Sequence, residues 1–257
     1  LALDTTLNLP VSGLSPTFAD LDNDGDQDLI LGDSNGRIHY FKNTSSFGTD
    51  ANYELESVNF YSIDINQYAT PFLFDMNQDG LYDLVIGRVD GTLTYAQNNG
   101  SESTPIFDVL LDDFGGVSVS NSDGSYGFSK PYIFEQDGSI QMLVGTESGR
   151  IYLYDNITNN LSGTFNLVDD YFQSIDEGKN STLVFDDFTN DNKRDLILGI
   201  QTGGLFYYKN ETFSILMSYK YILIVDIHIC SSSLGQILLS YNLLLQHTPD
   251  TEKLQSA

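Results

Sequence analysis

One unit occurs four times along the chain, and this repeat is the feature that most limits how the chain can fold. Each unit has a leading glycine, a second glycine four residues later, and an asparagine seven residues beyond that. The leading glycines are separated by 55, 58 and 54 residues, and they are Gly32, Gly87, Gly145 and Gly199. A period of this length is typical of architectures in which like units stack on one another.

Short apolar runs in each unit predict β-strands. Asp28-Leu-Ile-Leu-Gly32 and Ile151-Tyr-Leu-Tyr154 are rich in branched and aromatic residues, and Gly, Asn and Asp bound them. Each unit therefore supplies about four strands, of which the last is more polar than the others. Examples of these last strands are expected at residues 53–63, 105–114 and 163–175. Before residue 211 the apolar residues follow no helical period.

A four-stranded sheet cannot bury both of its faces alone, whereas radial stacking of like sheets buries them and leaves only short edges. The sequence therefore predicts an all-β fold, a β-propeller of four-stranded antiparallel blades over residues 1–211. The copies are expected at 14–69, 70–128, 129–181 and 182–211, with residues 1–13 as the outer strand of a blade. Either these blades are part of a larger propeller, which we favour, or residues 1–13 complete the fourth blade of a closed ring.

Three of the four units contain a loop in which side chains at positions 1, 3, 5 and 9 offer oxygen atoms. Gly or Asn at position 6 permits a left-handed turn, so that the carbonyl of residue 7 points inward. The predicted metal ligands, with residue 7 contributing its carbonyl, are Asp20, Asp22, Asp24, Asp26 and Asp28; Asp75, Asn77, Asp79, Leu81 and Asp83; and Asp187, Thr189, Asp191, Lys193 and Asp195.

Crowded carboxylates need a cation, since two of them about 4 Å apart repel by roughly 4 kcal/mol at an effective dielectric near 20. Flexible loops with oxygen ligands alone favour Ca²⁺ over Mg²⁺ or a transition metal, so we expect two to three calcium ions. The alternatives are turn capping by Asp and Asn, or surface charge that keeps the protein soluble. In the third unit the loop has shrunk to Glu135-Gln-Asp-Gly138, which predicts a metal-free hairpin turn.

Composition excludes several other functions. A formal charge of −25, from 36 acidic and 11 basic residues, repels a phosphate backbone, so nucleic acid is not an expected partner. A single cysteine, Cys230, rules out an intrachain disulfide and a thiolate zinc site.

Glycoside hydrolysis requires two carboxylates that face each other across a cleft. Here the aspartates crowd into local loops instead, so we expect no enzyme. Residues 227–247 lack charged side chains but contain several polar ones, and we expect no membrane span there.

The unit Phe-x-Asp-x-Asp-x-Asp-Gly-x-x-Asp-Leu-Ile-x-Gly, found at residues 18–32, resembles the FG-GAP or VCBS-type repeat of integrin-α-like β-propellers. Tyr126-Gly-Phe128, Val144-Gly-Thr-Glu-Ser-Gly149 and Ile175-Asp-Glu-Gly178 are similar to propeller modules of Bacteroidetes surface proteins that the type IX secretion system exports. The resemblance implies calcium in the loops, a propeller that usually has seven blades, and a secreted or outer-cell-surface location.

The composition changes at the C-terminus, and residues 212–257 form a separate extension. Residues 222–229 alternate as a strand would, and Ser233-Leu-Gly235-Gln resembles a turn in the β-sandwich sorting domain of type IX cargo. The usual Tyr-Pro-Asn-Pro opening is absent, so a degraded reading frame is the alternative.

These observations together predict a non-enzymatic, calcium-stabilised propeller module. We expect it to mediate adhesion or to bind a protein or carbohydrate ligand. The alternatives are the propeller part of a polysaccharide-degrading enzyme and a passive spacer, because a fold alone does not determine function.

Overall fold

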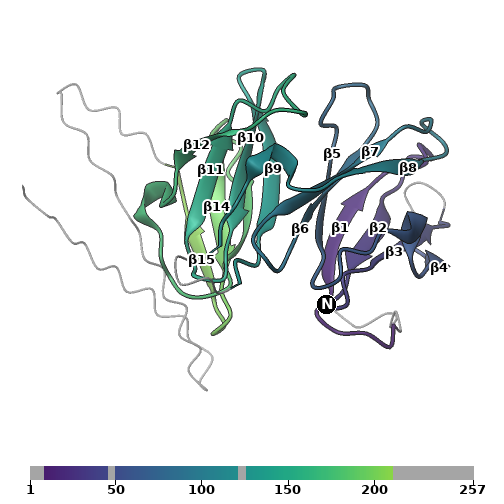
Figure 1. Cartoon of the computed structure of the whole chain (residues 1–257), viewed down its shortest axis with the longest axis horizontal. Helices are drawn as coiled ribbons and strands as arrows, with labels where there is room; N and C mark the ends of the chain where they lie inside the picture. The colour runs from purple at the N-terminus through teal and green to yellow at the C-terminus, as the bar shows by residue number, and fades with distance from the viewer. Residues whose placement is uncertain (1–8, 46–49, 121–125, 211–257) are drawn as a thin grey trace, which may run out of the picture. The chain divides into compact units, whose positions relative to one another are not determined.

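A computed structural model describes residues 9–45, 50–120 and 126–210 of the chain. Within them the fold is all-β, and the only helical segments are three short 3-10 turns (Figure 1). The strands of the first two sheets are β1 Ser15–Ala19, β2 Asp28–Gly32, β3 Ile38–Asn43 and β4 Tyr53–Ser57, then β5 Thr70–Phe74, β6 Asp83–Gly87, β7 Leu93–Asn98 and β8 Phe107–Leu111. The strands of the other two are β9 Lys130–Gln136, β10 Ser139–Gly145, β11 Ile151–Asp155 and β12 Asn166–Asp169, then β13 Thr182–Asp186, β14 Asp195–Gly199 and β15 Leu205–Tyr208.

Each sheet is an antiparallel meander in which strands pair in the order of the sequence. These sheets are the blades of a β-propeller, and the predicted fold class is confirmed. The described residues divide into two compact units, those up to 184 with 198–204 and those at 185–197 with 205–210, so the boundary runs through the fourth sheet.

The ends of the propeller region are only partly covered by the description. The fourth sheet has three strands among the described residues, and its expected outer strand, like the whole extension 212–257, lies outside them. Residues 9–13 contain no strand, and residues 1–8 lie outside the description, so the assignment of 1–13 to a blade stays a prediction.

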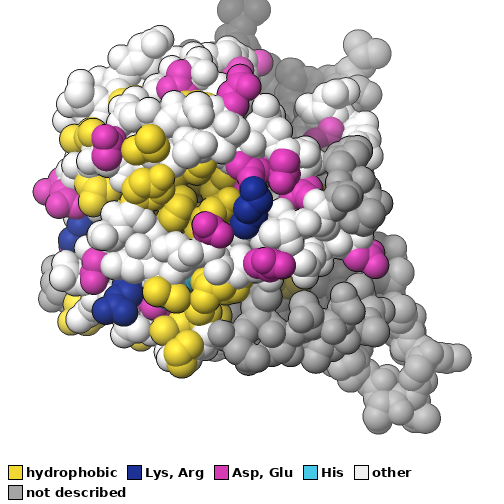
Figure 2. Space-filling view, turned by 90° about the vertical axis from the view of Figure 1, so that its right-hand side faces the viewer, with side chains coloured by type: hydrophobic (Ala, Val, Ile, Leu, Met, Phe, Trp, Pro, Cys, Tyr) yellow, Lys and Arg dark blue, Asp and Glu magenta, His cyan; other side chains and the backbone are white. Residues whose placement is uncertain are grey.

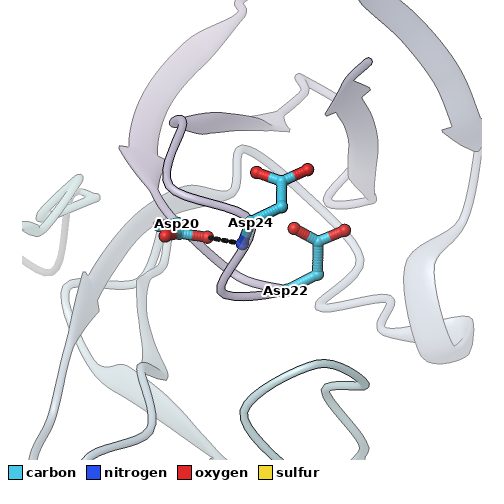
Figure 3. Close-up of side chains that lie close together, drawn as sticks. All are labelled: Asp20, Asp22 and Asp24. Atoms are coloured by element: carbon cyan, nitrogen blue, oxygen red, sulfur yellow. Dashed lines mark hydrogen bonds between the residues drawn. The ribbon is translucent and has the colours of Figure 1, made fainter. Parts of the chain in front are cut away.

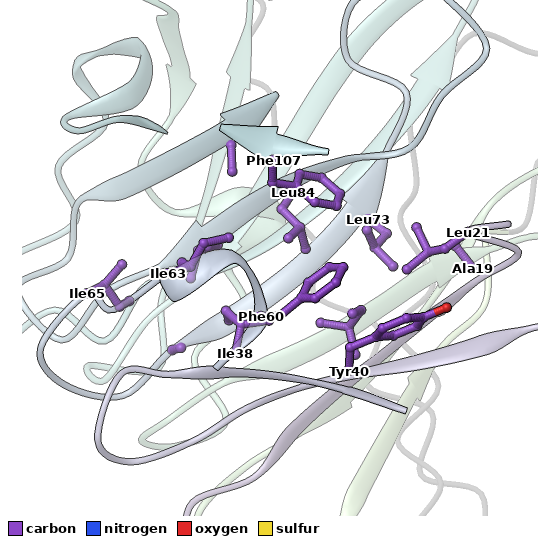
Figure 4. Packing of buried hydrophobic residues seen from close by; sticks show 14 residues of the cluster. Ala19, Leu21, Ile38, Tyr40, Phe60, Ile63, Ile65, Leu73, Leu84 and Phe107 are labelled. Atoms are coloured by element: carbon purple, nitrogen blue, oxygen red, sulfur yellow. The ribbon is translucent and has the colours of Figure 1, made fainter. Parts of the chain in front are cut away.

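Two hydrophobic cores fill the spaces between the first three sheets. Ile30 and Ile38 of the first sheet pack with Leu84 and Ile86 of the second, and all four are fully buried (Figure 4). Val85, which lies between the latter two on β6, belongs to the core shared with the third sheet. Successive residues of a strand point to opposite faces, so a middle blade supplies both of its neighbours.

The first three leading glycines lie where one sheet meets the next. A Cβ atom on Gly32 would lie 2.2 Å from the carbonyl oxygen of Ala69, the residue before β5. The equivalent distance is 2.0 Å for Gly87, measured to Ser129 before β9, and 2.4 Å for Gly145, measured to Ser181 before β13. No side chain fits in such a gap, which explains why glycine recurs at this position.

The outer strands are shorter than the sequence predicts, because a 3-10 turn follows each of them. These turns are η1 Phe60–Ser62, η2 Phe114–Gly116 and η3 Phe172–Ser174. The ring of Phe60 lies 4.8 Å from that of Tyr40, and the ring of Phe114 lies 4.6 Å from that of Tyr95. In the first two blades the turn therefore packs a buried aromatic ring against the third strand of the blade.

Candidate calcium-binding loops

The acidic loops connect the first and second strands of the first, second and fourth sheets. Their backbones share two left-handed residues. Position 6 has φ of 94° at Gly25, 90° at Gly80 and 63° at Asn192, which confirms the predicted turn. Position 4 is left-handed as well, with φ of 57° at Asn23, 60° at Gln78 and 56° at Asn190. The asparagines at position 4 in two loops were a usable signal, because Asn tolerates this conformation better than most residues.

The first carboxylate of each loop organises the turn. Asp20 accepts hydrogen bonds from the backbone amides of Asp24 (3.2 Å) and Gly25 (3.0 Å), and the first of these is drawn in Figure 3. Asp75 accepts the same pair of bonds from Asp79 and Gly80. Asp187 does so from Asp191 and Asn192. Turn capping is thus part of what these aspartates do, but a carboxylate has about four acceptor sites and retains capacity for a cation.

The first loop gathers the most acidic oxygen atoms. Ligand atoms of Asp20, Asp22 and Asp24 lie within 4.8 Å of one another, and no other acidic, His or Cys group of this kind occurs in the described part of the chain (Figure 3). The Oδ1 atoms of Asp22 and Asp26 are buried and have no hydrogen-bond partner. Unpartnered buried carboxylate oxygens are costly, so this loop fits a hard divalent cation that accepts oxygen ligands.

The raised pKa values of two loop aspartates also favour a bound cation. Burial raises the pKa of Asp24, and the charges of Asp22 and Asp26 raise it further, against a hydrogen bond from the Asp26 amide. In the second loop, burial raises the pKa of Asp83 to about 6, although hydrogen bonds from the Asn98 amide and the Tyr95 hydroxyl oppose the shift. A bound cation would oppose such shifts, because it stabilises the ionised carboxylate.

Position 9 has a structural role that the sequence reasoning missed. The buried Asp28 accepts hydrogen bonds from the Asn43 amide (2.8 Å), the Tyr40 hydroxyl (3.1 Å) and the Leu21 amide (3.3 Å). The same network is made by Asp83 with Asn98, Tyr95 and Met76, and Asp195 has bonds from Asn210 and Tyr207. This aspartate therefore joins the loop to the second and third strands of its blade. That it also binds metal remains a prediction.

The network leaves a signal in the sequence. In the third unit, the positions of Asp28 and Tyr40 relative to the leading glycine are occupied by Gln141 and Leu153. Aspartate and tyrosine are thus lost together in the one unit without an acidic loop. Their joint loss indicates that the aspartate and the tyrosine contact each other. They are 12 residues apart along the chain, so the sequence does not otherwise suggest this contact.

The other two loops provide fewer free oxygens. The Asn77 side-chain oxygen accepts the Asp79 amide (3.1 Å), and its nitrogen donates to the Asp79 carboxylate (2.8 Å). In the fourth sheet, the Lys193 Nζ lies 3.9 Å from a carboxylate oxygen of Asp191. Leu81, Lys193 and Thr189 lie in these loops, and that they contribute metal ligands stays a prediction. The first loop is therefore the strongest candidate for a metal site.

In the third unit, β9 and β10 pair without interruption to Gln136 and Ser139, and only Asp137 and Gly138 lie between them. Their φ angles of 53° and 75° are those of a two-residue hairpin turn, as predicted.

The charge of the surface and the length of the described helices are relevant to the possible partners of the protein. Acidic side chains outnumber basic ones on the face drawn in Figure 2. No helix in the described ranges is long and apolar enough to cross a membrane. The fold defines the protein as a β-propeller. Comparison with protein-family models and with curated proteins finds no match to the chain.

Proposed function

We propose that the protein is a calcium-stabilised β-propeller of the FG-GAP/VCBS type that acts at the outer cell surface or after secretion. The main support for this proposal is the cluster of Asp20, Asp22 and Asp24. Two buried carboxylate oxygens of the same loop, one from Asp22 and one from Asp26, have no hydrogen-bond partner. The repeated loop pattern in the second and fourth sheets supports two further sites, and therefore two to three ions in all.

In this proposal the ion supplies charge neutralisation and connects oxygen atoms that otherwise repel. Asp20, Asp22 and Asp24 would hold it with their side chains, and Asp26 with its carbonyl. Asp28 ties the same loop to β3 through Tyr40 and Asn43. Calcium binding therefore stabilises the junction between the first two strands of a blade.

The biological role that we propose is non-enzymatic adhesion or ligand binding, with a protein or a carbohydrate as the ligand. The loop aspartates cap turns and anchor strands within single blades, which supports a structural role for them over a catalytic one across a cleft. The loops between strands are then free to vary in sequence and to contact a partner, as loops on rigid scaffolds commonly do.

Thermal unfolding and calorimetric titration test the metal. Calcium at several millimolar should raise the melting temperature and magnesium should raise it less, with dissociation constants of about 10⁻⁴ to 10⁻³ M as in extracellular modules. Asp24→Asn should weaken calcium binding. Asp137→Asn in the hairpin turn of the third sheet is the matched control and should leave binding unchanged. A melting temperature that is the same in calcium and in chelator would refute the calcium site.

An array of glycans and extracellular proteins tests the binding role. Signals that depend on calcium would support it. A blank array would favour a passive spacer, and release of new sugar ends from a polysaccharide would favour an enzyme.

A further inference from the structure

A lysine lies against the first acidic loop. Lys42, on β3, donates a hydrogen bond from Nζ to the Oδ2 atom of Asp22. The side chain of Asp22 is only 11% exposed, and its other oxygen, Oδ1, is buried without a partner. The Oδ2 atom of Asp22 is thus paired with the positive charge of Lys42, whereas the Oδ1 atom accepts no hydrogen bond.

The second loop has no such lysine. Lys42 is the fifth residue of β3, and the fifth residue of β7 is Gln97. The two strands have the same pattern of burial, so the positions are equivalent. Asp22 likewise corresponds to Asn77, and the amide of Asn77 is bonded within its own loop. A charged pair in the first blade is therefore replaced by two neutral residues in the second.

Of the first two loops, the lysine accompanies the one with the greater negative charge; the fourth unit has a lysine, Lys209, at the equivalent position. The first loop contains five aspartates, at positions 20, 22, 24, 26 and 28, and the second contains three, at 75, 79 and 83. A lysine side chain is protonated at neutral pH, because its ordinary pKa is about 10.4. The Lys42 ammonium group, which donates to Asp22, therefore offsets part of the repulsion among these carboxylates.

We propose that Lys42 is a resident counter-cation of the first loop, which holds the loop together when calcium is scarce and competes with calcium for Asp22. This inference rests on the proposed calcium site. Two cations close to the same carboxylate repel each other, so the lysine lowers the affinity of this loop for the ion. The first loop then depends less on calcium for its conformation than its five aspartates alone would require.

Lys42→Gln, which introduces the residue found at position 97, tests the inference. The exposed Lys179→Gln is the control, because it changes the net charge by the same amount far along the chain from the loop. In chelator, Lys42→Gln should lower the melting temperature more than the control does. In saturating calcium the difference should shrink by at least half. The calcium concentration that half-protects the Asp24 and Gly25 amides from hydrogen exchange should fall on the order of tenfold.

A double variant keeps the test informative if Lys42→Gln folds poorly. Asp22→Asn with Lys42→Gln reproduces the neutral pair of the second blade and should recover most of the melting temperature lost in chelator. Equal destabilisation by Lys42→Gln in chelator and in calcium, with an unchanged calcium midpoint, would overturn the counter-cation role and leave the calcium site intact. Absence of calcium binding by the wild-type protein would instead remove the calcium site, and the inference with it.

Discussion

The first and third blades solve the same connection in two ways. In the first, β1 and β2 are joined by a loop with five aspartates, and Asp28 ties it to Tyr40 and Asn43. In the third, Asp137 and Gly138 alone connect β9 to β10. A blade of this propeller therefore pairs its strands without an acidic loop. The acidic loop and its anchoring network are present together in three blades and absent together from the third.

The largest expected effect concerns the anchoring aspartate. Asp83→Ala removes the acceptor for the Tyr95 hydroxyl and for the amides of Asn98 and Met76. We expect a loss of about 4 kcal/mol of unfolding free energy, since each unsatisfied buried donor costs about 1–3 kcal/mol and water reaches some of them. Gln141→Ala, at the equivalent position of the third blade, should cost less than about 1 kcal/mol. Urea unfolding in chelator measures both, and equal losses would mean that the two blades are not held differently.

Metal removal should affect the first and third blades differently. At a calcium concentration about 100 times the dissociation constant, each occupied site stabilises the protein by about 2.7 kcal/mol. Chelator should therefore speed hydrogen exchange at the amides of Asp24, Gly25, Asp79 and Gly80. Exchange at Ser139, beside the hairpin turn, serves as the internal reference and should not change. If the turn responds as strongly as the loops, the effect of calcium is global and not local.

Removing one hydroxyl is a smaller test. Tyr95→Phe keeps the ring, which stacks on Phe114, and loses only the bond to Asp83. We expect a cost of about 1–2 kcal/mol, because the bond is buried and its acceptor is a carboxylate. A double-mutant cycle with Asp83→Asn should show that the two losses are not additive. Additive losses would contradict the direct coupling of tyrosine and aspartate.

The smallest effect involves pH at the residue after the leading glycine. Asp33 follows this glycine in the first blade, where the third blade has Thr146. Burial raises the pKa of Asp33, but hydrogen bonds from the Arg37 amide, His39 and the Asn35 amide outweigh it, so the pKa lies below its ordinary value of 3.8. Asp33 therefore stabilises the fold above its ordinary pKa, and this contribution is lost as the pH falls through the folded-state pKa.

Asp33→Asn should remove this acid sensitivity. We expect the wild-type protein to lose more unfolding free energy than the variant between about pH 5 and pH 2, with the difference measured by urea unfolding. The same slope in both proteins would show that Asp33 is not held in its ionised form.

Much of the fold could be predicted because the repeat places local signals at fixed intervals. The strands after the acidic loops begin and end as expected, since an apolar run lies between Asp and Gly in each. The left-handed turn at position 6 follows from Gly25 and Gly80. The same reasoning correctly predicted the short hairpin of the third blade. Each of these features depends on residues that are near one another in the sequence.

What could not be predicted depends on contacts between distant residues. The anchoring role of Asp28 requires knowing that β2 pairs with β3, because Tyr40 lies 12 residues away. The sequence predicts strand at η1 and η3, because the positive φ there falls on Tyr61 and Gln173, which do not signal a turn as Gly115 does in η2. The Lys42–Asp22 pair spans 20 residues, and no other unit has both residues: the second unit has Asn77 and Gln97 at these positions, and the fourth has Thr189 and Lys209.

The contact of the leading glycines with the following blade has a consequence for how such a protein can grow. At Gly32, Gly87 and Gly145 the neighbour is a main-chain oxygen, and the requirement on the glycine side is only that no Cβ is present. This contact requires glycine on one side and a main-chain carbonyl, which every residue has, on the other. A duplicated gene segment that encodes one unit would therefore arrive with this joint already compatible, and the rest of its surface could diverge afterwards.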